Sequence, residues 1–265
     1  EYYPISILCK DINGMLEKEK IVQFEKENVI FEVLEKRENS IYVRGIRYRI
    51  YKWLDLNDVS IPNEEVIEAN EMEENRYFQS FLNKTEERVK HVSGKILHID
   101  GDNKYLRKCL DLYEELEIYA YGVCIKEEDI AKEILKYYYK VLPDVIVITG
   151  HDLYNSDGIK NIENYTNTRY YIEAIKKVRK IDKSVIIIAG ACQSNFEALI
   201  ASGADFASSP ARINIHTFDP AVIAVKAATT PVTKIINFNS VIKYIENGNK
   251  AFGGLETFGK MRLLL

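Results

Sequence analysis

Two stretches decide the fold of this chain: Val145-Ile-Val-Ile-Thr-Gly-His-Asp152 and Val185-Ile-Ile-Ile-Ala-Gly-Ala-Cys192. Each is a run of β-branched residues, typical of a buried strand, that stops at a potentially reactive side chain. The first run ends at His151 and the second at Cys192. Neighbouring parallel strands would bring both groups to one edge of a sheet, where open α/β sheets build their active sites. The sequence therefore predicts an α/β fold with a His and a Cys at the same sheet edge.

Residues 93–265 alternate strand-like and helix-like segments, which predicts a doubly wound, mostly parallel sheet with helices on both faces. Apolar stripes with the spacing i, i+3, i+4, i+7 predict the helices, as at Leu106, Cys109, Leu110 and Tyr113. Besides the strands that run into His151 and Cys192, the predicted strands are Lys95–Asp100, Glu117–Val123, Asp205–Ser208 and Val232–Asn237.

Residues 1–60 are predicted to form a small β-rich domain, either a barrel or a meander. Short alternating segments separated by polar turns carry this prediction. The four segments are Ile21–Phe24, Val29–Val33, Ser40–Arg44 and Arg47–Tyr51. Residues 61–92 are rich in Glu and compatible with a helix, which predicts an acidic helical connector whose charges are mostly solvated.

The composition favours a globular protein that neither inserts into a membrane nor binds nucleic acid. The chain has 265 residues and a net charge of −4, with no apolar run of membrane-spanning length and no signal-like opening segment. Its four cysteines lack C-x-x-C pairing and zinc-like spacing, so a reducing compartment, the cytoplasm, is expected. We expect no metal and no organic cofactor, and the sequence leaves the oligomeric state open.

Cys192 is the candidate nucleophile, because it follows a predicted strand instead of lying within it. Gly190 and Ala191 are small, so a tight turn into a helix is expected to leave the thiol accessible. A helix N-terminus there would favour the thiolate and direct N–H groups toward an oxyanion. The alternative is a small buried hydrophobe, as Cys9, Cys109 and Cys124 are taken to be. His151 is the candidate base, and its alternative is a loop histidine at a strand end.

His216 offers two further possibilities. The segment Gly190–Ser194 approximates the G-x-S-x-G nucleophile elbow with Cys in place of Ser, as in an α/β-hydrolase or a glutaminase-like amidohydrolase. Such enzymes place the His after the nucleophile, and His216 is the His that follows Cys192. His216 and Asp219 could also bind a metal, although two ligands alone do not define a metal site.

The order of His before Cys resembles that of the caspase–gingipain–clostripain class of cysteine peptidases, in which hydrophobic strands end in His-Gly and in Ala-Cys. Ala191-Cys192 matches this pattern, whereas His151 is followed by Asp152 instead of Gly. The resemblance implies a caspase-like sheet and an oxyanion site made by the backbone N–H groups of Asp152 and Cys192. The new carboxylate of Asp152 is expected either to orient the imidazole or to repel an anionic intermediate.

Seven motifs, two of which contain the strand ends at His151 and Cys192, occur in order along residues 94–265. They are His98-Ile-Asp-Gly-Asp102, Val147-Ile-Thr-Gly-His-Asp152, Ala189-Gly-Ala-Cys-Gln-Ser194, Ala207-Ser-Ser-Pro210, Ile215-His216, Asp219-Pro220 and Gly253-Gly-Leu-Glu-Thr257. In this order they resemble the YabG family of sporulation-specific peptidases. The resemblance implies processing of spore-coat and cortex-related precursor proteins in the sporulating cell, cleavage after Arg, and self-processing. A non-catalytic scaffold for coat assembly is the alternative.

Selectivity for Arg requires a carboxylate that faces the guanidinium group. In a caspase-like sheet the end of the first strand lies beside the substrate residue that precedes the cleaved bond. Here that strand end carries Asp100 and Asp102, and we predict both as the base of the S1 pocket. The alternative for Asp102 is to cap the following helix, and Asp205 and Glu197 are less favoured S1 acids. Self-processing would require an Arg directly before Glu1 in the full gene product.

Overall fold

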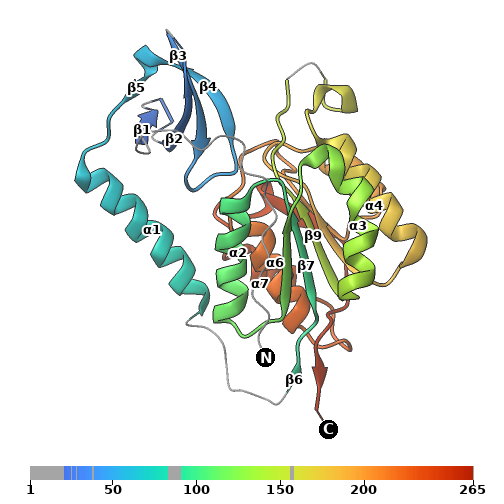
Figure 1. Ribbon diagram of the computed structural model, residues 1–265. Helices are drawn as coiled ribbons and strands as arrows, with labels where there is room; N and C mark the ends of the chain where they lie inside the picture. The colour runs from blue at the N-terminus through green and yellow to red at the C-terminus, as the bar shows by residue number, and fades with distance from the viewer. Residues whose placement is uncertain are drawn as a thin grey trace. The chain divides into compact units, whose positions relative to one another are not determined.

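The computed structural model describes residues 21–82, apart from 25, 28 and 38, and residues 91–264, apart from 156 and 157. Predictions for Cys9 and for the start of the chain at Glu1 lie outside the described residues. Figure 1 shows the ribbon with its element labels.

Contacts divide the chain into two compact units, one within residues 10–84 and the other within residues 85–265. Each unit has its own hydrophobic cluster of buried residues. The predicted boundaries at residues 60 and 92 stay predictions.

The smaller unit contains an antiparallel sheet in the order β4-β3-β2-β1-β5, followed by helix α1. Strands β1 to β4 form a meander, and β5 returns to pair with β1. The bounds are β1 (Ile21–Phe24), β2 (Val29–Lys36), β3 (Ser40–Gly45), β4 (Tyr51–Asp55), η1 (Leu56–Asp58), β5 (Val59–Ser60) and α1 (Glu64–Leu82). The predicted β-rich region is therefore confirmed as an antiparallel sheet for the part of it that the structure describes.

The prediction of a strand at Arg47–Tyr51 is wrong, because β4 begins where that segment ends. The Gly45 N–H donates to the Ile50 carbonyl, and the Ile50 N–H donates to the Tyr48 carbonyl. These two hydrogen bonds close the hairpin between β3 and β4. The alternating residues that suggested a strand are therefore part of the turn.

A six-stranded sheet lies at the centre of the larger unit, in the order β8-β7-β9-β10-β11-β12. The pairs β8–β7, β7–β9, β9–β10 and β10–β11 are parallel, and β12 is antiparallel to β11. The strands are β7 (Ile96–Asp100), β8 (Ala120–Cys124), β9 (Val145–Thr149), β10 (Ile186–Ala189), β11 (Phe206–Ser208) and β12 (Phe252–Gly254), and β6 (His91–Val92) pairs with β13 (Arg262–Leu263) outside this sheet. The predicted α/β fold with a mostly parallel sheet is confirmed, while a caspase-like form of the sheet stays a prediction.

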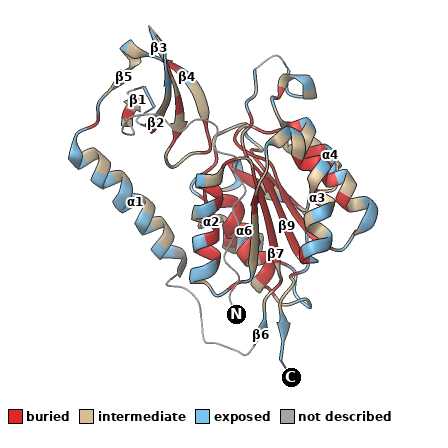
Figure 2. Cartoon of the chain, in the orientation of Figure 1, coloured by how far each residue is buried: buried red, intermediate tan, exposed pale blue. Residues whose placement is uncertain are grey.

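Helices cover both faces of this sheet. Helices α2 and α6 pack on one face, and α3, α4 and α5 pack on the other (Figure 1). The helical segments are α2 (Asn103–Glu115), α3 (Glu127–Val141), η2 (Ile162–Asn164), α4 (Thr168–Ile181), α5 (Phe196–Ala201), α6 (Asp219–Thr229), α7 (Phe238–Ile242) and η3 (Gly248–Lys250). Because both faces are covered, β7, β9 and β10 are buried along their whole length, as Figure 2 shows for β7 and β9.

The prediction of a sixth strand at Val232–Asn237 is also wrong. Among the described residues this segment forms no strand of a sheet: it makes an isolated bridge between Ile235 and Phe258 and a few backbone hydrogen bonds to residues 257–261. Its β-branched side chains Val232 and Ile235 are about half exposed, so they lie at the surface instead of in a sheet. The sixth strand is β12, whose two glycines gave no strand signal.

Candidate active site

The candidate site lies at the carboxyl edge of the sheet, where the strand order reverses. The chain passes from β7 to β8 on one side and then to β9 on the other side of β7. Parallel α/β sheets bind their ligands at such reversal points. Asp100 and Asp102 end or follow β7, His151 and Asp152 follow β9, and Cys192 follows β10.

His151 and Cys192 follow neighbouring parallel strands at the same level. The register pairs Ile148 of β9 with Ala189 of β10. His151 comes three residues after Ile148, and Cys192 comes three residues after Ala189. The structure therefore places the two residues at corresponding positions beyond the sheet edge. Their roles in catalysis stay a proposal.

The prediction of an accessible Cys192 thiol is wrong, because the side chain is 0% exposed. The Ile215 N–H donates to Cys192 Sγ at 3.3 Å, and Sγ lies 3.8 Å from the Ile215 carbonyl oxygen. The expected turn directly into a helix is also absent, since α5 begins at Phe196 with Asn195 as its cap. The Ile215 N–H is thus a donor at the sulfur, and such a donor can stabilise a thiolate.

The sequence reasoning missed Glu127, the first residue of α3. Glu127 Oε1 accepts a hydrogen bond from the backbone N–H of His151 and lies 2.8 Å from His151 Nδ1. On the other side of the ring, His151 Nε2 lies 3.9 Å from Asp102 Oδ2. Two carboxylates therefore flank the imidazole. No motif marks Glu127, because its contact with His151 arises only when α3 packs on the sheet.

Among the described residues, the Asp152 carboxylate makes its hydrogen bonds with groups other than the His151 imidazole. Its Oδ2 accepts hydrogen bonds from the hydroxyls of Thr168 and Ser194, the latter at 2.8 Å. Its Oδ1 accepts from the backbone N–H groups of Asn167 and Leu153. Burial raises the pKa of the Asp152 carboxyl above its ordinary value, while these four donors act in the opposite direction. Asp152 therefore ties the loop after β9 to α4 and to the loop after β10.

The two acids predicted for the S1 pocket have different surroundings. Asp100 is fully buried, with Oδ2 3.6 Å from His98 Nε2 and Oδ1 accepting from the Asp102 N–H. Asp102 caps α2, since its Oδ1 accepts from the N–H groups of Lys104 and Tyr105. The capping alternative for Asp102 is therefore observed, and its Oδ2 remains beside His151.

The alternative S1 acids are held in ion pairs. Asp205 Oδ2 lies 2.6 Å from Arg179 Nη2, and Glu197 pairs with Arg212. These contacts give both carboxylates a structural partner within the described chain.

His216 is fully buried and directly follows Ile215, whose backbone N–H contacts Cys192 Sγ. Its ring Nδ1 accepts from the Phe218 N–H at 3.3 Å, and the backbone N–H of His216 donates to Asp219 Oδ2 at 2.9 Å. Within the described residues, no group of three or more His, Cys, Asp and Glu side chains is arranged to hold a metal ion. Nor is any described helix both long and apolar enough to cross a membrane.

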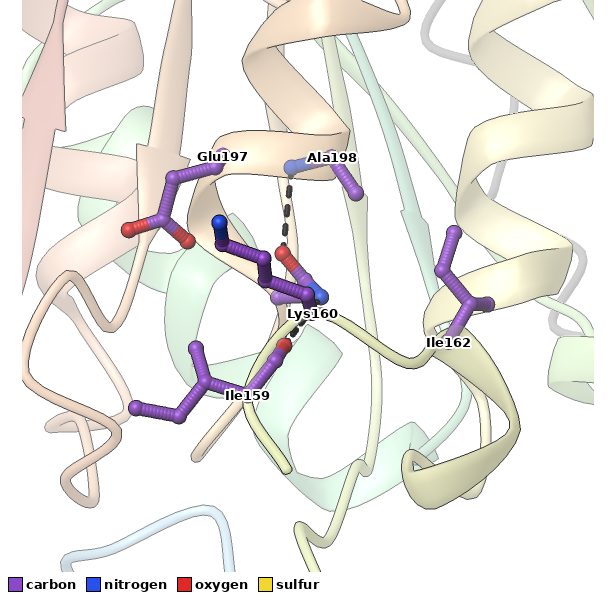
Figure 3. Close-up of a pocket in the computed structure, with 6 residues that line it drawn as sticks. Ile159, Lys160, Ile162, Glu197 and Ala198 are labelled. Atoms are coloured by element: carbon purple, nitrogen blue, oxygen red, sulfur yellow. Dashed lines mark hydrogen bonds between the residues drawn. The ribbon is translucent and has the colours of Figure 1, made fainter.

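A pocket of about 420 Å³ lies beside the start of α5 (Figure 3). Ile159, Ile162 and Ala198 give it an apolar lining, and Lys160 and Glu197 add one charge of each sign. Such a lining can hold an aliphatic side chain together with a polar neighbour. The pocket lies in the loop and helix that follow the two candidate strands.

A family model described as YabG peptidase U57 matches residues 23–265. The chain belongs to the YabG peptidase family. A curated YabG relative, the sporulation-specific protease YabG of Bacillus subtilis (strain 168), is 39% identical over 197 residues. The matched region covers 72% of this chain and 68% of the relative. As a member of the YabG family, the chain is a peptidase that acts on protein substrates.

Proposed function

We propose that this YabG-family chain is a sporulation-specific cysteine endopeptidase that cleaves after Arg in spore-coat and cortex-related precursor proteins and processes itself. The observation that carries the cysteine mechanism is the placement of His151 and Cys192 at matching positions beyond two neighbouring parallel strands. The name of the Bacillus subtilis relative supports the link with sporulation.

In the proposed reaction the Cys192 thiol passes its proton to His151 Nε2, and the thiolate attacks the carbonyl carbon of a substrate Arg. The imidazolium then gives the proton to the leaving amine as the C–N bond breaks, which leaves a thioester. Water next loses a proton to Nε2 and attacks the thioester. The C–S bond breaks and the proton returns to sulfur.

The oxyanion is proposed to bind the backbone N–H groups of Asp152 and Cys192. Among the described residues the Asp152 N–H donates no hydrogen bond, which supports this role. The Asp152 carboxylate is held by Thr168 and Ser194, so its charge is already hydrogen-bonded when the oxyanion forms. Because the thiol is fully buried and its sulfur contacts Ile215, the structure around it must open before a substrate can reach it.

The S1 pocket is proposed to use Asp100 and Asp102 for the guanidinium of the substrate Arg. Asp102 is the more suitable of the two, because its Oδ2 lies beside His151 whereas Asp100 is fully buried against His98. Bidentate or single charge-assisted hydrogen bonds from a guanidinium to this carboxylate would favour Arg over Lys.

The test is cleavage of an Arg-ended fluorogenic peptide and its Lys-ended twin by the wild type and by Cys192→Ala. We expect release from the Arg peptide that is lost in the variant. Release that survives in Cys192→Ala would overturn the assignment of the nucleophile, and equal release from the two peptides would overturn the Arg preference.

One observation favours a second base. Ile215, whose amide contacts Cys192 Sγ, directly precedes His216, so a histidine that follows the nucleophile lies near the sulfur. Cleavage by two variants distinguishes the two mechanisms. In the proposed mechanism, His151→Ala abolishes cleavage and His216→Ala spares it. The reverse result would favour an elbow-type mechanism.

A further inference from the structure

Glu127 holds the His151 residue through two of its nitrogen atoms. The same carboxylate oxygen, Oε1, is 2.8 Å from the backbone nitrogen and 2.8 Å from Nδ1 of the ring. We propose that Glu127 is a positioning residue that fixes the tautomer and orientation of the His151 imidazole, so that the catalytic group is a Cys192–His151–Glu127 triad. This inference rests on the proposed function for its catalytic meaning.

The chemistry of the contact defines the tautomer. An ionised carboxylate oxygen only accepts hydrogen bonds, so the proton of the neutral ring lies on Nδ1 when it binds Glu127. Nε2 then carries the lone pair that can take a proton from the Cys192 thiol. A ring held in the other tautomer would present an N–H to the thiol and could not act as its base.

The hydrogen bond to Nδ1 also fixes the direction of the ring. Because one oxygen contacts both the main chain and Nδ1, rotation of the imidazole away from Glu127 breaks the side-chain hydrogen bond while the backbone bond remains. The Glu127 side chain is only 14% exposed, so water competes weakly for its oxygens. Its position at the first residue of α3 adds the favourable field of a helix N-terminus to an acceptor carboxylate.

The ends of two strands are shaped to admit this carboxylate. A Cβ built on Gly101, after β7, would lie 2.1 Å from Glu127 Oε1, and a Cβ on Gly150, after β9, would lie 2.4 Å from the same atom. Both distances are far shorter than a van der Waals contact, so any larger residue at either glycine must displace the carboxylate. The Gly101 N–H donates to the Thr149 carbonyl, which joins the two strand ends around Glu127.

Asp102 is the other carboxylate beside the ring, but its geometry suits a different role. Its Oδ2 is 3.9 Å from His151 Nε2, which is beyond hydrogen-bond distance, and its Oδ1 is used to cap α2. The Tyr105 ring of α2 also faces the imidazole, with centroids 6.1 Å apart. Asp102 can therefore add to the field at Nε2, while Glu127 makes the close contact that orients the ring.

The first test is the kinetics of Glu127→Gln in the full chain with an Arg-ended peptide. A Gln amide is neutral and can turn either its oxygen or its NH2 group to Nδ1, so the ring loses the charged, accept-only partner that fixes its proton on Nδ1. We expect kcat to fall about 10²- to 10⁴-fold, with KM little changed, because Glu127 contacts the Nδ1 side of the ring and not the Nε2 side that would face the substrate. Glu127→Asp keeps the charge but retracts the carboxylate by one methylene, and it should recover part of the loss. Glu128→Gln, on the exposed neighbour, is the matched control.

The second test reads the tautomer without activity. Ring nitrogen-15 shifts, with the His151 signals identified by their absence in His151→Ala, should show a proton on Nδ1 in the wild type. Glu127→Gln should change that pattern, and Glu128→Gln should leave it unchanged. An unchanged pattern together with kcat within threefold of the wild type would overturn the inference.

The two proposals can fail separately. If the wild type shows no Cys192-dependent cleavage, the proposed function fails, and the ring spectra still decide whether Glu127 sets the tautomer. If Glu127→Gln does not fold, Glu127→Asp gives both readouts in its place. Cleavage that depends on Cys192 and His151 but is insensitive to both Glu127 variants would leave a dyad and remove the third member.

Discussion

At the scale of single residues, one substitution can separate the observed role of Asp102 as the cap of α2 from its proposed role as an S1 acid. Asn is as good a helix N-cap as Asp, so Asp102→Asn should keep α2 capped while removing the charge beside His151. We expect kcat/KM for an Arg-ended peptide to fall by about 100-fold, as for loss of one charge-assisted contact, with little change in Tm. Peptide kinetics beside Asp111→Asn, an exposed acid of the same helix, test this. Full Arg selectivity in Asp102→Asn would place the S1 acid elsewhere.

Asp152 should make the stability of the larger unit depend on pH. Burial raises its pKa in the folded chain above the ordinary value of 3.8, so the folded state binds the proton more tightly than the unfolded state. Its contribution to the free energy of unfolding is then fully present below that ordinary pKa and declines as the pH rises through the raised pKa. Asp152→Asn removes the titration, and its amide can still accept from the N–H groups and donate to the hydroxyls.

The measurement is the urea midpoint of both proteins from about pH 4 upward. The stability of the wild type relative to Asp152→Asn should decline over this interval, whereas Glu128→Gln should follow the wild type. Parallel pH profiles for the wild type and Asp152→Asn would show that the four hydrogen bonds compensate for burial.

At the scale of elements, Arg179 joins α4 to the sheet. Its Nε donates to the Gly203 carbonyl, its Nη1 to the Val185 carbonyl, and its Nη2 to Asp205. Arg179→Ala removes all three donors and leaves the partly buried Asp205 carboxylate without its cation, although Oδ2 keeps the Ile187 N–H at 2.7 Å, so we expect a loss of about 2–4 kcal/mol in the free energy of unfolding. Arg169→Ala, also in α4, breaks an exposed ion pair with Glu163 and should cost about 0.5 kcal/mol or less. Equal midpoints for the two variants in urea would contradict the role of Arg179.

The sequence predicted those elements whose local pattern agrees with their environment. Buried runs of β-branched residues gave β9 and β10, and the inward stripe of α4 is fully buried, as at Tyr171, Ile175 and Val178. It failed where tertiary contacts override the pattern. The Val232–Asn237 run resembles a strand but lies at the surface, whereas β12 has no β-branched residue at all.

The candidate site was predictable to the same extent. The strand ends gave His151, Cys192 and the acids after β7, because parallel strands bring their carboxyl ends together. Glu127 could not be found in this way, since it lies on a helix and reaches His151 only through packing. The burial of Cys192 also depends on a distant segment, the one containing Ile215.

At the scale of the whole molecule, the two units have separate hydrophobic clusters and can be followed separately. The single Trp of the chain is Trp53 in β4, with the Arg37 guanidinium 4.0 Å from its ring centroid. Trp fluorescence therefore reports on the smaller unit, whereas far-ultraviolet circular dichroism is dominated by the helices of the larger unit. Arg179→Ala should shift the dichroism transition in urea and leave the fluorescence transition in place. A common shift of both signals would mean that the units unfold together.

Because the Cys192 thiol is buried and contacts Ile215, its rate of alkylation measures how fast the structure around it opens. Because the thiol is fully buried, alkylation requires a local opening that exposes the sulfur, so the rate with iodoacetamide should stop rising at high reagent concentration and approach the opening rate. A peptide substrate must wait for the same opening, and the plateau rate then sets an upper limit on turnover by the free enzyme. Alkylation that stays proportional to reagent concentration, at a rate like that of the partly exposed Cys124, would show that the thiol is open in solution.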